Sequence, residues 1–438
     1  MGNTQEPVRL LVDFAQTIID LWQQCLGERY HSPIYYLASL ICYVLQLNTI
    51  AVAPYIISSL VPVCTTTCRL VVLPRFNSQD GDISRHPDNA VRQLDADGEV
   101  AQSFCLLILA ALGCVTSPIA ESGEFVPFGS CPQREFWRNV DVELVLVMLS
   151  PKHPEADWFG MLSLLWTSVL PESIGPIPDR VSLAAYEGNP QKERPSLERV
   201  ATALIDRLSA FLIDVPAWAT RGSVKELSVR LTILKTLILF AASPFGIVQI
   251  ARSNVTVQRL VTVLCWAIDQ LYNVDSLALY QAATRNPVPD ESQTEEGDSL
   301  APGAHGRNRG VDTMEVDGLG RQDSPASDPP GLTEGLIDDM DRHSSEMLCR
   351  IVAQAVLLLH TLVMDPRTTR IVNLAAQLAT SSGCPQRYLQ SLARLNFADE
   401  ELVYEAGIDA ATSELAHDLL EMAVTPDEGE SMSRLFNP

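Results

Sequence analysis

The feature that most constrains the fold is the stretch Tyr30–Cys68, which contains no Asp, Glu, Lys or Arg. Such a long uncharged stretch has to be covered, either by a lipid bilayer or by other parts of the protein. A membrane span needs about 20 consecutive, mostly apolar residues. Polar residues such as Gln46 and Asn48, and the prolines Pro54 and Pro62, divide the stretch into shorter apolar pieces. These pieces favour buried helices over membrane spans.

The composition excludes several classes of function. The chain has 438 residues and a formal net charge of −23, and an acidic surface repels phosphate backbones, so we predict no direct nucleic-acid binding. The N-terminus lacks the pattern of a secretion signal. Ten cysteines are scattered, mostly in apolar runs, as is typical of reduced thiols in an intracellular protein. The closest pair, Cys64 and Cys68, has no second pair at zinc-site spacing.

Helical periodicity dominates the sequence. The residues between Leu11 and Cys25 repeat at spacings of three and four before Gly27, and Leu197–Leu212 repeats the pattern after Pro195 and Ser196. Further stretches are apolar on most of their circumference, which predicts helices covered on two sides. They span residues 226–242, 257–272, 347–363 and 368–379.

Strands are not indicated by any comparable pattern, although Arg69–Phe76 is compatible with one short strand. Proline-rich joints are expected to separate the helices in Pro74–Asp97, Val115–Pro132 and Leu170–Arg180. The helices between them are about 10 to 20 residues long, a length that suits antiparallel pairs stacked as a solenoid. We therefore predict an all-α helical-repeat protein whose repeat is degenerate.

One segment differs in composition from all the others. Between Arg285 and Pro330 there is no aromatic residue and no Ile, while Pro, Gly, Asp, Glu and Ser abound. Such a segment cannot bury enough apolar surface to offset its chain entropy, so we predict a long, disordered acidic insertion. The expected domain organisation is a helical repeat region at 1–283, the insertion at 284–335, and C-terminal helices at 336–438 that continue the array.

Motifs for catalysis, cofactors or metals are not found. The glycine-containing stretches lie in the predicted insertion, without a strand before them or a helix after them. No GxSxG or HExxH pattern occurs. The seven histidines are dispersed, and His360 is expected to be a core residue with one hydrogen bond. We predict that the protein is not an enzyme and needs no cofactor.

The strongest charge feature is the C-terminal segment Phe397–Glu430. It contains eleven Asp and Glu residues and no Lys or Arg, together with apolar stripes. One interpretation is a solvated acidic cap on the last helices of the array. The other is a docking surface for a basic groove on a partner, where charge would steer association.

Three serines are candidate phosphorylation sites. Ser78 and Ser292 precede Gln, which is the minimal site of DNA-damage kinases, and Ser324 precedes Pro. All three lie in polar segments that a kinase is expected to reach.

Three blocks carry a family resemblance. They are Arg134–Ile177, which begins REFWRNVDVELVLVML, Leu357–Asp409, and Glu414–Glu430. Together they resemble the helical C-terminal region of the ATR-interacting protein (ATRIP) family in its fungal form. The resemblance implies a soluble, nuclear HEAT-like solenoid, so Tyr30–Cys68 is expected to form two or three interior helices broken at Pro33, Pro54 and Pro62.

The resemblance also implies a function. Members of the family are obligate, non-catalytic partners of the ATR checkpoint kinase, which implies a scaffold in DNA damage and replication stress signalling and leaves room for a homodimer within the kinase complex. No charged heptad region or acidic recruitment peptide precedes the first helix, so the chain is expected to be a C-terminal portion or a shortened product. Replication protein A is then expected as a partner only if a recruitment segment exists outside this chain.

Kinase contacts are expected in the acidic C-terminal segment. The alternative functions are an unrelated helical-repeat adaptor in transport or trafficking and, further off, a polytopic membrane protein. The expected contact residues are Phe397, Glu400, Glu401, Tyr404, Glu405 and Leu419.

Overall fold

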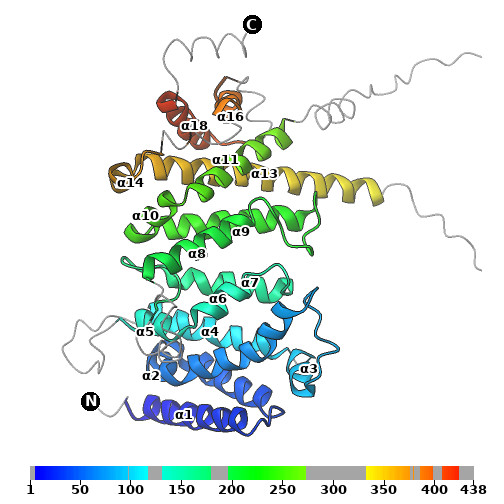
Figure 1. Cartoon of the computed structure of the whole chain (residues 1–438), viewed down its shortest axis with the longest axis vertical. Coiled ribbons are helices and arrows are strands. Elements are labelled where there is room, and N and C mark those ends of the chain that lie inside the picture. The colour runs from blue at the N-terminus through cyan, green and yellow to red at the C-terminus, as the bar shows by residue number, and fades with distance from the viewer. Residues whose placement is uncertain are drawn as a thin grey trace, which may run out of the picture. The chain divides into compact units, whose positions relative to one another are not determined.

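The computed structural model of the chain is all-α (Figure 1). It describes residues 5–96, 98–116, 131–178, 196–272, 332–374, 378, 385–397 and 407–423. Within these ranges no strand occurs, and the only β-type pairing is an isolated bridge between Leu170 and Ser173. The predicted all-α class is therefore confirmed. Most of the predicted insertion, up to residue 331, lies outside the described residues.

Two compact units are present. One combines Met1–Leu271 with His343–Pro438, and the other is Tyr272–Arg342. In the second unit the described residues are Tyr272 and the first part of a helix that begins at Leu332. The domain boundaries expected from sequence remain a prediction.

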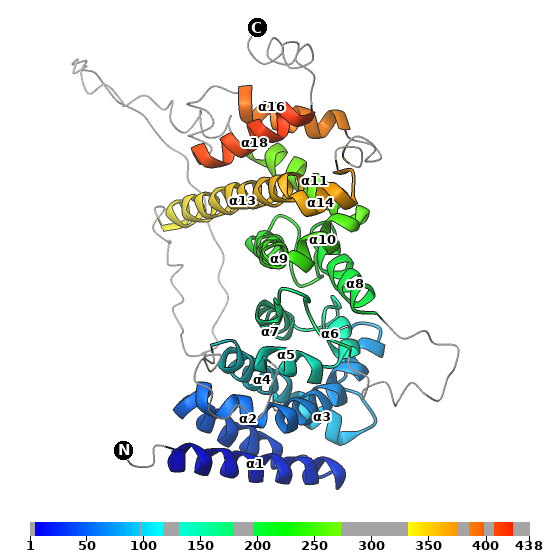
Figure 2. The ribbon, with the colours of Figure 1, turned by 90° about the vertical axis from the view of Figure 1, so that its left-hand side faces the viewer.

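Helices of the first unit are stacked in chain order, beginning with a layer of long helices. The first, α1, packs on α2, and α2 packs extensively on α4 (Figures 1 and 2). The bounds in this part are α1 (Gln5–Gly27), α2 (Ile34–Asn77), α3 (Asn89–Ala96), α4 (Glu99–Thr116), α5 (Pro132–Asn139), α6 (Val142–Met148), α7 (Glu155–Leu165) and the 3₁₀ turn η1 (Trp166–Ser168).

The second half of the stack continues the same arrangement. Both views place α13 between the α9–α10 layer and the α16–α18 layer (Figures 1 and 2). The bounds here are α8 (Leu197–Ala210), α9 (Val224–Ala241), α10 (Pro244–Arg252), α11 (Asn254–Leu271), α13 (Leu332–Met364), α14 (Pro366–Ile371), α16 (Pro385–Phe397) and α18 (Ala410–Ala423).

Local sequence signals set the helix ends. Ser196, Ser223 and Ser243 each occupy an N-cap position and accept a hydrogen bond from the backbone N–H three residues later. Such caps satisfy donors that have no partner within the helix. The helices predicted to start after Ser196 and to end at Gly27 are both present.

The long helix α2 corrects two expectations. It does not break at Pro54 or Pro62, but at Asn48, whose backbone is non-helical (φ −159°, ψ 75°). The Asn48 side chain accepts a hydrogen bond from the N–H of Ala51 at 3.2 Å, so it caps the helix that follows. The break expected at Pro33 is found, since this residue is the N-cap of α2.

The possible strand at Arg69–Phe76 is wrong, because α2 continues through it to Asn77. Packing explains the difference. Val71 and Val72 are fully buried and Arg75 is 8% exposed, so neighbouring helices cover this part of α2. Tertiary contacts of this kind outweigh the weak β-propensity of the segment. Likewise the helix expected at 368–379 is interrupted, because α14 ends at Ile371 and Val372 is extended.

Buried cations connect the layers. Arg75 of α2 forms ion pairs with Asp95 of α3 and, at 2.5 Å, with Asp157 of α7. Asp157 is 6% exposed, and burial raises the pKa of its carboxyl group, whereas the adjacent guanidinium opposes this shift. A buried charge is tolerated only when it is paired in this way.

Arg230 of α9 plays a similar part further along the stack. It pairs with Glu226 at 2.8 Å and donates to the carbonyl of Leu212 at 3.0 Å. Its guanidinium also lies 3.7 Å from the centre of the Trp266 ring in α11. Ion pair, hydrogen bond and cation–π contact together fix α9 against its neighbours.

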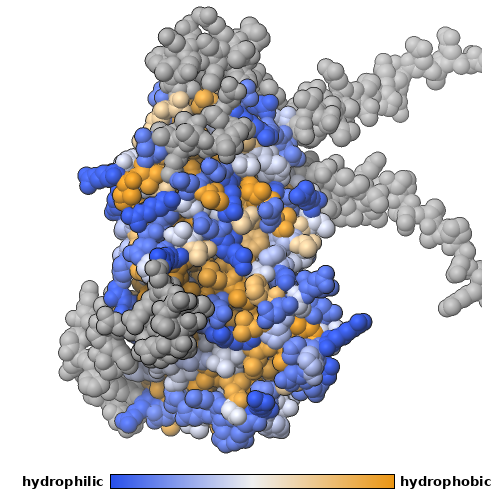
Figure 3. All heavy atoms as spheres, in the orientation of Figure 1, coloured by the Kyte–Doolittle hydropathy of each residue, from blue (hydrophilic) through white to orange (hydrophobic). Residues whose placement is uncertain are grey.

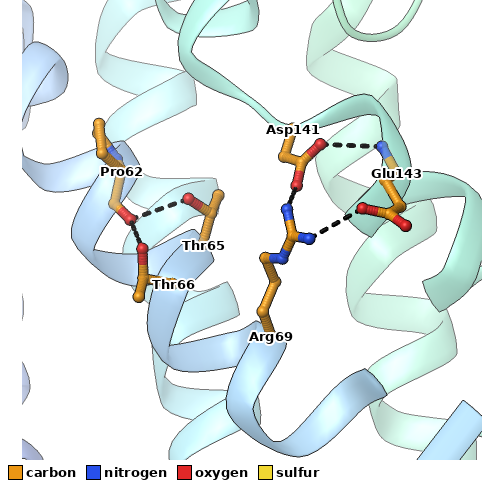
Figure 4. A network of polar contacts seen from close by, with 6 residues as sticks. All are labelled: Pro62, Thr65, Thr66, Arg69, Asp141 and Glu143. Carbon is orange, nitrogen blue, oxygen red and sulfur yellow. Dashed lines mark hydrogen bonds and ion pairs between the residues drawn. The ribbon is translucent and has the colours of Figure 1, made fainter. Parts of the chain in front are cut away.

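A partly exposed polar network joins α2 to α6 (Figure 4). Arg69 pairs with Asp141 and, at 2.8 Å, with Glu143, while Asp141 also caps α6 by accepting from the N–H of Glu143 at 3.0 Å. One turn earlier, the hydroxyls of Thr65 and Thr66 donate to the carbonyl of Pro62. Because the ions of this network are partly solvated, it contributes less stability than a buried pair of the same geometry.

Three described helical segments are long and apolar enough to cross a membrane by length and composition. They are Ile34–Asn77, Glu99–Thr116 and Ser344–Met364, and 61%, 56% and 50% of their most apolar windows are buried inside the structure. Half or slightly more of each window is thus covered by other parts of the protein.

Candidate interaction surfaces

The C-terminal helices are held on the array by contacts from α16 and α18. Arg394 and Arg387 of α16 both pair with Asp269 of α11, with Arg394 at 2.9 Å. His360 of α13 lies 3.3 Å from Asp418 of α18, so the expected hydrogen bond is present, although the side chain is 18% exposed and not fully in the core. These pairs are exposed or partly exposed, so each contributes about 1 kcal/mol or less and serves mainly to set orientation.

Helices α16 and α18 pack on each other, and both bury apolar side chains. Tyr388, Leu392 and Leu395 of α16 are at most 2% exposed, and so is Leu419 of α18. Burial raises the pKa of the Tyr388 phenol. Leu419, which the sequence suggested as a partner contact, is therefore part of the intramolecular core.

The other expected contact residues lie at the edge of the described part of the chain or outside it. Phe397 is the last residue of α16, and its side chain is not among those described. Glu400, Glu401, Tyr404 and Glu405 lie outside the described residues. Their role in binding stays a prediction.

In the described part of the acidic segment, three acidic residues share one face of α18. Glu414, Asp418 and Glu421 follow one another at spacings of four and three, which places them on the same side of the helix. The side chains of Asp418 and Glu421 are 45% and 70% exposed, and Glu421 lies 3.3 Å from His417. We refer to Glu414, Asp418 and Glu421 as the α18 acidic face, which can attract a basic surface.

Ser78 follows the last residue of α2 and is half-buried. Its hydroxyl donates to the carbonyl of Arg75 at 2.8 Å, and its own carbonyl accepts from Lys152 Nζ at 2.6 Å. A kinase would need to release these contacts to reach the hydroxyl. Ser292 and Ser324 lie outside the described residues, so phosphorylation stays a prediction at all three serines.

Candidates for catalytic chemistry are not assembled in the described part of the chain. No group of three or more His, Cys, Asp or Glu side chains there is arranged to hold a metal ion. Cys64 and Cys68 are fully buried in α2, and burial raises the pKa of the Cys68 thiol to about 12. A thiol with such a high pKa is a poor nucleophile at neutral pH.

An exposed apolar surface on α2 was not anticipated from the sequence, which suggested an interior helix. Before the break at Asn48, α2 exposes Tyr36, Leu40, Tyr43 and Leu47, which we call the α2 ridge. The signal was present in their spacing of four, three and four residues, which defines a second apolar stripe beside the buried one. Hydropathy alone could not show which stripe the other helices cover.

Comparison with known proteins gives two matches to family models. Residues 63–363 match the model described as Rad26-like, helical repeats, and residues 372–436 match the model described as Rad26-like, C-terminal domain. The first match includes helices α3 to α11 and most of α13, and the second includes α16 and α18.

Among solved structures, the chain is similar to the crystal structure of Myceliophthora thermophila Rad26 (residues 373–841). The two chains are 45% identical, the alignment covers 97% of this chain and 90% of that one, and the TM-score is 0.70. No curated protein gives a significant match.

Proposed function

This chain belongs to the Rad26-like family, the fungal form of the ATRIP family, and we propose that it is a non-catalytic partner and scaffold of an ATR-type checkpoint kinase. The observation that carries the proposal is the 45% identity to Rad26 over 97% of the chain. It implies a nuclear role in DNA damage and replication stress signalling.

The mechanism proposed is binding alone. A stack of helices presents a long, fixed surface, and a partner gains its position from contacts along that surface. Buried apolar contacts would supply most of the affinity, and charge would set the rate and orientation of association. No step requires chemistry by this chain.

Within this scheme the α18 acidic face is the docking element that the described residues support best. It carries three carboxylates on one side of a helix, and residues 407–423 contain no Lys or Arg to neutralise them. The predicted contacts Phe397, Glu400, Glu401, Tyr404 and Glu405 adjoin it in sequence. We propose that the partner offers a basic surface to this end of the array.

The test is co-expression with the N-terminal helical segment of the cognate ATR-type kinase, followed by measurement of complex recovery and of the association rate. Deleting residues 399–438 tests the whole acidic segment at once, but it also removes the packing of α18 against α16 and can therefore disturb the fold. The double variant Glu414→Lys/Glu421→Lys changes charge on exposed positions only. Asp80→Lys/Asp214→Lys, also at exposed acidic residues but in other layers, is the matched control.

The expected result is a soluble complex with the wild type and with the control. The α18 variant should lose at least tenfold in affinity, chiefly through a slower association rate that responds less to salt. A complex that forms equally well with both variants would keep the kinase as partner and remove α18 from the interface. No complex with well-folded protein would overturn the proposal and favour an unrelated helical-repeat adaptor.

A further inference from the structure

Helices α2 and α4 lie side by side in parallel, and two contacts fix their register. Near the start of α4, Gln102 Nε2 donates to Ser39 Oγ at 2.6 Å. Further along, a Cβ added at Gly113 would lie 2.8 Å from the Thr49 carbonyl oxygen, so the two backbones nearly touch there. The offset in residue number is the same for both contacts to within one residue. The two helices therefore keep one register between these points.

That register places Cys42 of α2 opposite Cys105 of α4. Both thiols are free, and they share a hydrogen bond across the two helices. Gln46 Nε2 donates to Cys42 Sγ at 3.6 Å, which orients the Cys42 side chain from its own helix. A disulfide needs Cα atoms about 4.4–6.8 Å apart, a separation that two helices reach only where they approach closely. The contact at Gly113 shows such an approach, so the two thiols are placed to be joined.

The pair is accessible to reagents in water. Cys105 is the one exposed cysteine among those that the structure describes, and Cys42 is half-buried beside it. By contrast, Cys64, Cys68 and Cys114 are buried. An oxidant that diffuses in water therefore meets Cys105 first and finds a second thiol next to it.

The surroundings of the pair are apolar. No charged residue occurs in Tyr30–Cys68 or from Val100 to Ala120, and Figure 3 shows apolar surface over the layers that contain α2 and α4. Burial, and after it the neighbouring Cys105 thiol, raise the pKa of Cys42, so Cys42 stays protonated at neutral pH. Neither stretch supplies a cation that would activate a thiol. The pair thus suits a slow, stoichiometric response to an oxidant rather than turnover as a peroxidase.

We propose that Cys42 and Cys105 form a redox-sensitive dithiol, which a hydroperoxide such as hydrogen peroxide converts to a disulfide between α2 and α4. The sulfur of Cys105 attacks one peroxide oxygen, the O–O bond breaks, and the leaving hydroxide takes the thiol proton to give water and a sulfenic acid. The Cys42 thiol then attacks that sulfur, the S–S bond forms, the S–O bond breaks, and a second water leaves. Two electrons pass from the two thiols to the peroxide, and an external thiol reverses the step.

The disulfide has a consequence for the N-terminal layers. It closes a loop from residue 42 to residue 105 that contains the second part of α2 and the whole of α3. Such a link restricts the unfolded chain, so the oxidised protein resists opening of these layers. The step needs no other protein and is therefore independent of the proposed kinase partner.

Peptide mapping of the full chain after exposure to hydrogen peroxide tests the proposal directly. Free thiols are blocked, and digestion with chymotrypsin, which cuts after aromatic residues and leucines, separates Cys42 from Cys64 and Cys105 from Cys114. We expect a linked pair of peptides that carries Cys42 and Cys105, about 2 Da lighter than the sum of the reduced peptides and lost after reduction with dithiothreitol.

A mixture of ¹⁵N-labelled and unlabelled protein shows whether the link forms within one chain. Each linked pair should then carry a single isotope. Linked pairs that combine both isotopes, or the absence of a link at peroxide concentrations that oxidise Cys105, would overturn the proposal.

Serine variants test the role of each thiol. Cys42→Ser should form no link and should accumulate a sulfenic acid at Cys105, which dimedone traps, whereas Cys105→Ser should leave Cys42 reduced. Cys25→Ser, at another half-buried thiol but on α1, is the matched control and should form the link like the wild type. Circular dichroism before oxidation checks that each variant is folded.

Urea unfolding provides a second readout on the same samples. Oxidation should raise the midpoint of the wild type and of Cys25→Ser, and dithiothreitol should return both to their starting values. Cys42→Ser should show no such rise. A Cys42→Ser protein whose midpoint rises as in the wild type would overturn the proposal, whatever the kinase assay gives.

Discussion

The close crossing of α2 and α4 allows a quantitative prediction of what happens when the side-chain hydrogen of one glycine is replaced by a methyl group. A Cβ added at Gly113 of α4 would lie 2.8 Å from Ala53 Cβ, 2.8 Å from the Thr49 carbonyl oxygen and 2.9 Å from Thr49 Cγ2. Carbon atoms in contact normally lie about 3.5–4.0 Å apart. Two of the three obstacles belong to short side chains and one to backbone, so the helices themselves would have to separate by roughly 0.7 Å.

Gly113→Ala should therefore destabilise the fold. Overpacking a close contact costs about 1–3 kcal/mol, and the higher helix propensity of alanine returns up to about 1 kcal/mol. We expect a net loss of about 1–2 kcal/mol. Gly160→Ala in α7 is the matched control, because its Cβ would meet only Phe104 at 3.7 Å, an ordinary contact. This variant should be stabilised by up to about 1 kcal/mol through propensity alone.

Urea unfolding followed by circular dichroism measures both variants against the wild type. The midpoint should fall for Gly113→Ala and stay level or rise for Gly160→Ala, with unchanged slopes. A Gly113→Ala protein as stable as Gly160→Ala would refute the reasoning, since it would mean that α2 and α4 do not approach as closely as the structure places them.

Four further variants test polar and charged groups that pack near the end of α2. Burial and the positive charge of Arg75 lower the pKa of His153 to about 4, so the unfolded chain binds a proton that the folded one does not as pH falls from 6.5. Stability should then drop by up to about 3 kcal/mol between pH 6.5 and 4, and urea titrations of His153→Leu should lack this drop. Arg75→Met leaves Asp157 buried without its cation and should cost about 3–5 kcal/mol. Adding Asp157→Leu should recover much of that loss, and a loss equal in single and double variants would contradict the pairing. Lys152 donates to the carbonyls of Phe76 and Ser78 at 2.9 and 2.6 Å, so Lys152→Met should lower the unfolding free energy by about 1–2 kcal/mol, whereas an unchanged midpoint would argue against this cap.

Helix content was predictable because periodicity and capping agree along most of the chain. The α1 repeat ends at Gly27 and the α8 repeat starts after Ser196, as local signals require. These signals act over one or two turns, and nothing at long range opposes them. Both helices were therefore accessible to sequence reasoning.

Long-range packing determines the features that could not be predicted from the sequence, namely where α2 breaks and which of its sides is exposed. In α2, Pro54 and Pro62 are tolerated inside the helix, while Asn48 caps a new one. A proline normally breaks a helix interior by removing one hydrogen bond, but here α1 and α4 cover the helix and stabilise it. The same limit hid the α2 ridge, because a helix that is apolar all round does not reveal which side its neighbours leave uncovered.

The position of Arg75 has a consequence for how the stack opens. In an array where each layer contacts only its neighbours, amide hydrogens should exchange layer by layer from the ends. Arg75 of α2 pairs with Asp95 of α3 and with Asp157 of α7, so detachment of α3 or of α7 breaks one of its two ion pairs. Amide hydrogens in these three helices should accordingly exchange in one concerted step. The N-terminal layers would then open as a single cooperative unit, whereas the remaining layers would open one after another.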